Sequence, residues 1–173
     1  HGSGDTASNY MTTSRWKSIA DSQGFVMAAP HKVGGTWIVN AGSADGAFAD
    51  AVIKDVRASH SINAKRIYAV GFSQGGYFCY TYGMERSTTI AAIGVQSASQ
   101  SGPTFNPSRK IPVIFVVGSL DSAHSRAQTE SKRLQQAGHP SKFISLPGEG
   151  HCCAAQHDKN QDVWNFFKLY SLP

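Results

Sequence analysis

The hydrophobic positions of the chain follow two alternating patterns. Short runs of nearly continuous apolar residues occupy residues 25–29, 67–72, 90–96, 113–118 and 143–146. Since such runs are apolar on both faces, they predict strands buried on both sides of a parallel sheet. Longer stretches have apolar residues at helical spacing and predict helices at residues 11–23, 47–59, 75–84, 122–137 and 158–169. The alternation predicts a doubly wound, mostly parallel α/β sheet with right-handed crossovers.

Signals at the ends of these segments support the prediction. Gly24 and Gly138 directly follow two of the helical stretches, where glycine commonly ends a helix. Asp45 stands just before the stretch at 47–59, where an acidic side chain favours the helix dipole. No internal repeat or low-complexity linker interrupts the pattern, so we expect residues 1–173 to form a single domain.

Composition and charge narrow the classes of partner. Apolar residues make up 40% of the chain and charged residues only 16%, so small polar residues must cover much of the surface. This is typical of exported proteins and predicts a secreted or periplasmic location. The strongly apolar run at 111–117 is far shorter than the ~20 residues of a membrane helix, so no membrane span is expected. The net charge of +5 is scattered rather than gathered into a stripe, which argues against a nucleic-acid partner.

Three cysteines are present, Cys79, Cys152 and Cys153, which is too few for a disulfide framework. Their spacing does not favour a metal site, and no metal is expected. A disulfide from Cys79 to either Cys152 or Cys153 would leave one thiol free. Adjacent cysteines such as Cys152 and Cys153 rarely bond to each other. The pairing among the three stays open at this stage.

The sequence GFSQGG at residues 71–76 matches the pattern G-x-S-x-G, with Ser73 at its centre. It follows a predicted strand and opens a predicted helix, which is the context that a nucleophilic serine of this type needs. Gly71 and Gly75 leave space for a sharp turn, and the turn holds the serine in a strained, exposed conformation. The backbone N–H of Gln74 points toward the same space.

A serine hydroxyl is a poor nucleophile at neutral pH and needs a base together with an acid that orients the base. In this kind of fold the chain order is serine, acid, histidine. Asp121 follows the predicted strand at 113–118, and His151 follows the strand at 143–146 in the sequence PGEGH. Because these groups follow parallel strands, we expect Ser73, Asp121 and His151 to meet at the carboxyl edge of the sheet.

Each candidate has an alternative. Asp121 could instead cap the helix that begins near residue 122. Asp158 and Asp162 are weaker candidates for the acid because both follow His151 in the sequence. The other histidines lack the position after the last strand and are predicted to be surface or loop residues: His31, His60, His124, His139 and His157.

Seven motifs extend the argument to almost the whole chain. In chain order the motifs are HGSGDTASNY at 1–10, ADSQGFVMAAP at 20–30, GGTWIVN around Trp37, ADGAFADAVIKDV at 44–56, AKRIYAVGFSQGG at 64–76, IPVIFVVGSLD at 111–121 and GEGH at 148–151. With these motifs the sequence resembles the α/β-hydrolases, and among them the polyhydroxybutyrate depolymerase and feruloyl or acetylxylan esterase group.

The resemblance implies roles for further residues. In this group an HG segment supplies a backbone N–H to the oxyanion hole, and here the residue after HG is Ser3. Gln74 would supply the second N–H, while His1 would be structural. Trp37 is expected either to line the substrate cleft or to be a core residue. The alternative for the opening segment is a flexible, glycine-rich terminus.

The resemblance also implies strands before the HG segment, one of them between the strand at 25–29 and the strand at 67–72. The sequence begins after that point. Three arrangements are consistent with this. The strand belongs to a longer product, a second chain or dimer partner supplies it, or the two edges close up in a reduced sheet of about five strands.

The sequence therefore predicts a serine carboxylic-ester hydrolase that needs no cofactor. Its expected substrates are short-chain or aromatic esters, such as feruloyl, acetyl or hydroxyalkanoate esters, free or borne on a polymer. One alternative is a peptidase or thioesterase of the same fold. Another is a non-catalytic, hydrolase-like module that binds a carbohydrate or a protein.

Overall fold

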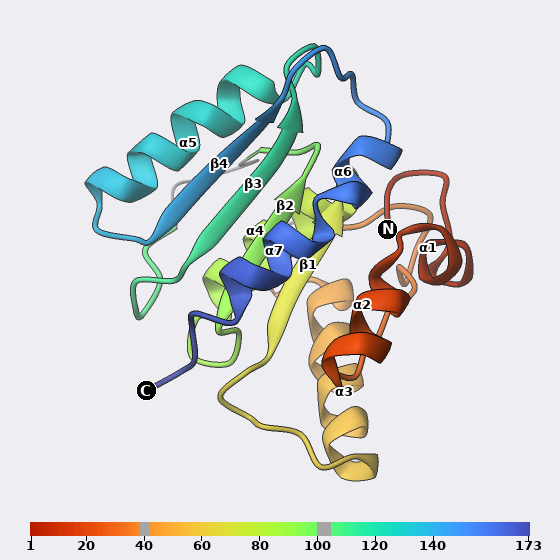
Figure 1. Cartoon of the computed structure of the whole chain (residues 1–173). Coiled ribbons are helices and arrows are strands. Elements are labelled where there is room, and N and C mark those ends of the chain that lie inside the picture. The colour runs from red at the N-terminus through yellow and green to blue at the C-terminus, as the bar shows by residue number, and fades with distance from the viewer. Residues whose placement is uncertain (39–41, 100–104) are drawn as a thin grey trace.

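The computed structural model describes residues 1–38, 42–99 and 105–173. Within these residues a parallel four-stranded sheet runs in the order β1-β2-β3-β4. Its strands are β1 (Tyr68–Phe72), β2 (Ala92–Gln96), β3 (Val113–Gly118) and β4 (Ser141–Leu146). Figure 1 shows them side by side, with the helices packed around them. The α/β fold predicted from the sequence is confirmed.

Seven helices are found in the described part of the chain. They are α1 (Ala7–Thr13), α2 (Trp16–Gln23), α3 (Ala44–Ser59), α4 (Gln74–Glu85), α5 (His124–Gln136), α6 (Ala154–Asp158) and α7 (Asn160–Phe167). Helix α4 connects β1 to β2, and α5 connects β3 to β4. None of the helices described is both long enough and apolar enough to cross a membrane.

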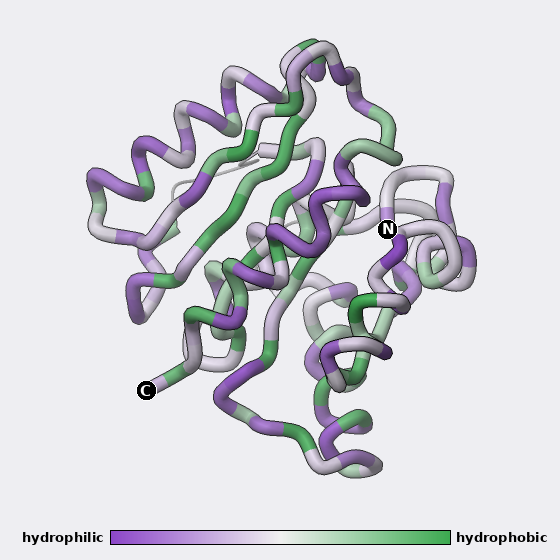
Figure 2. Tube along the Cα trace, in the orientation of Figure 1, coloured by the Kyte–Doolittle hydropathy of each residue, from purple (hydrophilic) through white to green (hydrophobic). Residues whose placement is uncertain are grey.

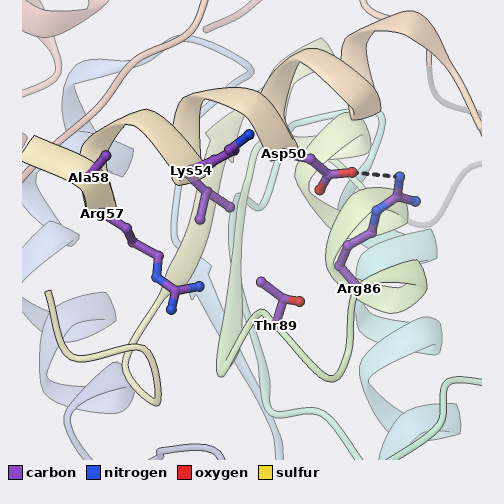
Figure 3. Close-up of a pocket in the computed structure, with 7 residues that line it drawn as sticks. Asp50, Lys54, Arg57, Ala58, Arg86 and Thr89 are labelled. Carbon is purple, nitrogen blue, oxygen red and sulfur yellow. Dashed lines mark hydrogen bonds and ion pairs between the residues drawn. The ribbon is translucent and has the colours of Figure 1, made fainter.

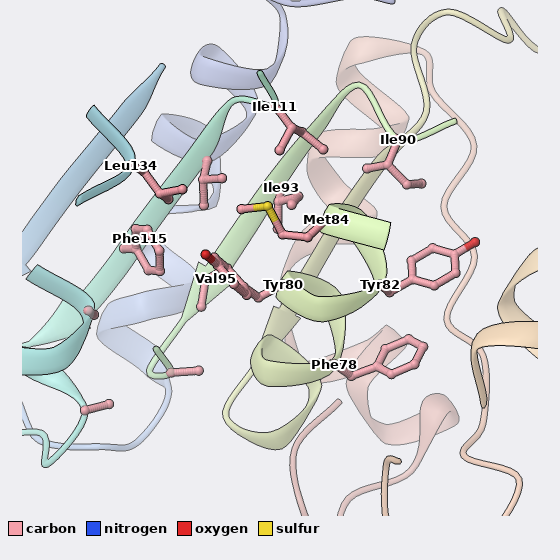
Figure 4. Close-up of a cluster of buried hydrophobic side chains, with 14 of the residues drawn as sticks. Phe78, Tyr80, Tyr82, Met84, Ile90, Ile93, Val95, Ile111, Phe115 and Leu134 are labelled. Carbon is pink, nitrogen blue, oxygen red and sulfur yellow. The ribbon is translucent and has the colours of Figure 1, made fainter. Parts of the chain in front are cut away.

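The strands alternate their side chains between two cores, one on each face of the sheet. On β3, Phe115 packs with residues of α4 and α5, whereas Ile114 packs with residues of α7. Figure 2 shows β3 as an apolar segment, whereas β4 at the edge of the sheet also carries polar residues. Figure 4 shows the first core, in which Phe78, Tyr80 and Met84 of α4 lie over the sheet. This burial on both faces explains why β3, and β2 up to Gln96 at its end, lack the polar positions of a half-exposed strand.

The prediction of a strand at residues 25–29 is wrong. These residues have no strand partner, and Phe25 instead packs on Trp164 of α7, with ring centroids 4.3 Å apart. The segment is apolar because it covers the second core, and periodicity cannot separate that from burial within a sheet. The sheet thus has four strands rather than about five, and among the described residues none pairs with the outer edge of β1.

One predicted helix is divided in two, and another is preceded by a helix that was not predicted. The stretch at 11–23 breaks at Arg15, whose backbone is left-handed with φ of 62°, so α1 and α2 meet at an angle. Beside the break, the carbonyl oxygen of Ser14 accepts a hydrogen bond from Asn160 Nδ2 at 2.6 Å. The stretch at 158–169 corresponds to α7, and the short helix α6 before it was not predicted. The contact beside Arg15 is a tertiary one, which periodicity does not record.

Candidate active site

Ser73 lies at the turn between β1 and α4, in a conformation that few residues adopt. Its φ is 52° and its ψ is −122°, a strain worth about 1–3 kcal/mol in general. The turn is possible because the neighbouring glycines lack side chains. A Cβ on Gly71 would collide with the carbonyl of Gly75, and a Cβ on Gly75 would lie 2.5 Å from the carbonyl oxygen of His1. The strained serine predicted from G-x-S-x-G is therefore present.

His151 reaches this serine from the loop after β4. Its Nε2 atom lies 2.9 Å from Oγ of Ser73. The loop is fixed against the end of β3, because Leu120 N–H donates to the Glu149 carbonyl at 2.9 Å. The imidazole is 53% exposed, so the Ser73–His151 pair is open to solvent.

Asp121 lies beneath the imidazole with its side chain fully buried. Its Oδ2 atom is 2.9 Å from His151 Nδ1, and its Oδ1 atom accepts the backbone N–H of Ala123 at 2.9 Å. Asp121 does not cap α5, whose N-cap residue Ala123 has no side-chain cap, so the capping alternative is wrong. One oxygen holds the turn before α5, and the other contacts the histidine.

The rival acids lie elsewhere. Asp158 forms an ion pair with Arg15, and Asp162 lies 3.5 Å from Lys159. Of the other histidines, His31 and His60 are exposed, as expected. His157 departs from the prediction, because it is a buried residue of α6 rather than a surface or loop histidine. Burial and, to a lesser extent, the nearby Arg15 cation lower the pKa of His157.

The opening segment packs directly on the nucleophile turn. His1 is buried, and a Cβ added to Gly2 would lie 3.4 Å from the Cβ of Ser73. Ser3 follows them and is exposed. The opening segment therefore packs against the turn that carries Ser73 and is not the free, flexible terminus considered as the alternative.

Trp37 holds the opening segment in place. Its side chain is 5% exposed, stacks on Phe78 with centroids 4.5 Å apart, and donates from Nε1 to the His1 carbonyl at 2.8 Å. Of the two roles considered for Trp37, the structure has the core residue and not a wall of an open cleft. Residues 39–41, which follow this tryptophan, lie outside the described residues.

Gln74 offers a backbone N–H next to Ser73, and its side chain binds the segment around Trp37. Its backbone N–H belongs to the first residue of α4, where a helix offers no internal acceptor. Its side chain hydrogen-bonds to Thr36 Oγ1 and accepts the Trp37 backbone N–H at 3.3 Å. No pattern in the sequence points to this side-chain role, because only the fold brings Gln74 next to residues 36 and 37.

The cysteine pairing differs from the sequence expectation. Cys152 and Cys153, directly after His151, form a disulfide with each other, and Cys79 is the free cysteine. Cys79 lies on α4 and packs against the first core, so it does not reach the loop after β4. Burial raises the pKa of the Cys79 thiol to about 11, which disfavours the reactive thiolate.

A surface groove of about 580 Å³ lies along α3 (Figure 3). Its lining includes Lys54, Arg57 and Arg86. Arg86 is already paired, 3.1 Å from Asp50 and 2.7 Å from Glu85. The groove contains none of the serine, histidine or acid residues described above.

The geometry defines a class of protein. A parallel sheet carries a serine at a strained strand-to-helix turn, and a histidine and a buried aspartate follow from later loops in the order Ser73, Asp121, His151. This is the arrangement of the α/β-hydrolases. The sequence model of the dienelactone hydrolase family matches residues 35–168, and the chain belongs to that family.

Individual relatives agree with this assignment. The chain is 29% identical over 207 residues to a bifunctional acetylxylan esterase/xylanase, XynS20E, of Neocallimastix patriciarum. The match covers 99% of the chain but only 30% of the relative, so the chain spans under a third of that protein's length. The expected resemblance to the α/β-hydrolases, with an acetylxylan esterase among the relatives, is confirmed, whereas the resemblance to polyhydroxybutyrate depolymerases stays a prediction.

Solved structures share the fold at low identity. FphF, a fluorophosphonate-binding serine hydrolase of Staphylococcus aureus, superposes with a TM-score of 0.79 and 16% identity, covering 96% of this chain and 80% of that one. The feruloyl esterase module from Clostridium thermocellum superposes with a TM-score of 0.73 and 16% identity, covering 96% and 75%. Similarity at this level establishes the fold and nothing finer.

Proposed function

We propose that the protein is a serine carboxylic-ester hydrolase whose reaction passes through an acyl-enzyme. Ser73 Oγ attacks the ester carbonyl carbon while His151 Nε2 accepts the hydroxyl proton. The tetrahedral intermediate collapses, and His151 returns the proton to the departing alcohol. Water then attacks the acyl-enzyme with His151 as base, which releases the acid and regenerates Ser73. The continuous contact from Ser73 through His151 to Asp121 carries the proposal.

In this mechanism Asp121 orients the imidazole and stabilises its protonated form. Full burial of the carboxylate strengthens this interaction, since less solvent screens it. The backbone N–H groups of Ser3 and Gln74 bind the oxyanion. Removing one side-chain donor from the oxyanion hole of another serine hydrolase costs about 3 kcal/mol of transition-state stabilisation. Besides the substrate and water, these steps draw on side chains and backbone groups of the chain.

The substrates are short-chain or aromatic carboxylic esters, free or borne on a polymer. Two observations support this part of the proposal: the exposed imidazole, which leaves the site open, and the similarity to an acetylxylan esterase and a feruloyl esterase module. A peptidase or thioesterase would use the same residues. A panel of acetyl, feruloyl and hydroxybutyrate esters, thioesters and peptides separates these activities by their kcat/KM values.

The proposal extends to partner and location. The outer edge of β1 has no strand beside it among the described residues, which favours completion of the sheet by another segment or a second chain. Measurement of the native mass distinguishes a monomer from an assembly. The Cys152–Cys153 pair and the low charge content favour an exported protein, since disulfides persist in oxidising compartments.

The decisive experiment is intact-mass analysis after reaction with a fluorophosphonate probe. We expect one adduct per chain in the native protein and none in Ser73→Ala. Ester hydrolysis should fall at least ~10³-fold in the same variant. An unlabelled, folded native protein would contradict the enzyme proposal and favour a non-catalytic binding module. Labelling that persists in Ser73→Ala would assign the nucleophile to another residue.

A further inference from the structure

Gln96, at the end of β2, is bonded to the nucleophile turn through its backbone. It pairs with Phe72 in the strand register, and its carbonyl oxygen accepts the Ser73 N–H at 2.8 Å. The Gln96 side chain is fully buried. Its Nε2 atom donates to the Gln156 carbonyl at 2.8 Å and to Asn160 Oδ1 at 2.7 Å.

Gln156, on α6, continues the chain of contacts to the histidine loop. It is also fully buried, and its Nε2 atom donates to the carbonyl oxygen of Gly150 at 3.0 Å. Gly150 directly precedes His151. The same segment is confined from the opposite side, since a Cβ on Gly118 would collide with the Gly150 carbonyl. The backbone of His151 is thus held between β3 and the Gln156 amide.

The chemistry of the contacts fixes the orientation of both amides. Every group that the two side-chain nitrogens face is an acceptor, so each must present its NH₂ group there. Asn160 donates from Nδ2 to Ser14, which leaves its Oδ1 atom toward Gln96. Among the described residues the Oε1 atoms of Gln96 and Gln156 are buried without a partner. Such a group costs about 1–3 kcal/mol, so apolar side chains would suit a core better here.

We propose that Gln96 and Gln156 are positioning residues, forming a buried amide relay that fixes the nucleophile turn relative to the base. Gln96 holds Ser73 by its carbonyl and α6 by its side chain. Gln156 then holds the backbone of His151 through Gly150. The relay gives a role to two buried amides that core packing alone does not require. The proposal rests on the proposed roles of Ser73 and His151.

Gln156→Met tests the relay, because it keeps the length of the side chain and removes its donor. We expect kcat for p-nitrophenyl acetate and the fluorophosphonate labelling rate to fall about 10- to 100-fold, as for a small misplacement of a reacting group. KM should change little. The far-downfield proton resonance of an imidazole N–H bonded to a carboxylate, here His151 to Asp121, should broaden or disappear.

Gln161→Met is the matched control, since Gln161 is exposed on the neighbouring helix α7. It should keep the native rate and the native resonance. A folded Gln156→Met protein with native rate and resonance would overturn the relay. Absence of labelling in the native protein would instead overturn the proposed function, so the two failures are distinguishable.

Should Gln156→Met fail to fold, the native protein still provides the test. On phosphonylation of Ser73, the side-chain amide resonances of Gln156 should shift, and those of Gln161 should not. An unchanged Gln156 amide would contradict the relay.

Discussion

His151 Nε2 lies 2.9 Å from Ser73 Oγ, although 78 positions separate the two residues in the chain. The contact joins the turn after β1 to the loop after β4, and these are the two outermost strands of the sheet. Because the strands are parallel, all their carboxyl ends lie on the same side of the sheet, and the two loops can converge there. The predictions below test what this convergence does.

Asp121→Asn should reduce kcat by about 10⁴-fold, the loss known for the equivalent change in another serine hydrolase. An asparagine oxygen can still accept the Ala123 N–H, so the turn before α5 is kept. Its NH₂ group then faces His151 Nδ1 and favours the wrong tautomer. Steady-state kinetics with p-nitrophenyl acetate measure the effect.

Asp158→Asn is the control for this substitution. Asp158 is exposed and pairs with Arg15, so its neutral variant should keep native kinetics. A comparable loss of activity in both variants would contradict the special role of Asp121.

Gly75→Ala should abolish most activity and lower the free energy of unfolding by about 1–3 kcal/mol. The added Cβ would lie 2.5 Å from the His1 carbonyl oxygen and would displace the opening segment from the nucleophile turn. Gly34→Ala is the control, since nothing lies within 4 Å of a Cβ there. Native activity in Gly75→Ala would show that the packing of His1 on this turn is unimportant.

The buried His157 should make the protein less stable in mild acid. Because its folded pKa is below its usual value of 6.5, the unfolded chain binds the proton more readily. Stability is therefore complete above about pH 6.5 and is lost as the pH falls from that value toward the lowered folded pKa.

Urea denaturation at about pH 5 and about pH 8 measures this dependence. His157→Phe, which keeps a ring against Tyr10 and Phe72, should show a smaller difference between the two conditions. His139, whose pKa burial also lowers, remains in both proteins and leaves a residual dependence. An unchanged difference would contradict the assignment to His157.

Thiol titration tests the cysteine arrangement. Under denaturing, non-reducing conditions we expect one thiol per chain, from Cys79, because Cys152 and Cys153 are bonded to each other. In the native protein this thiol should react slowly, since burial raises its pKa to about 11. Peptide mapping should find Cys152 and Cys153 in one oxidised peptide. Three thiols, or a bond to Cys79, would contradict the structure.

Some elements could be predicted because local pattern was enough. The strand at 113–118 matches β3 at both ends, since its residues are buried on both faces and a glycine ends it. The turn at Ser73 was also predictable, because its strain needs glycine at fixed positions. Where a segment's environment is set by distant residues, prediction failed: residues 25–29 cover a core, and Arg15 breaks a helix.

The parallel α/β framework and the candidates Ser73, Asp121 and His151 could be inferred from the sequence, because hydrophobic periodicity, turn glycines and chain order can be read along the chain. Which side chains meet became clear only from the folded chain. There Trp37 packs under the opening segment, Cys152 is bonded to Cys153, His157 is buried, and Gln96 is linked to Gln156. Apart from the bond between the adjacent cysteines, each of these contacts depends on packing between elements that are distant in the sequence.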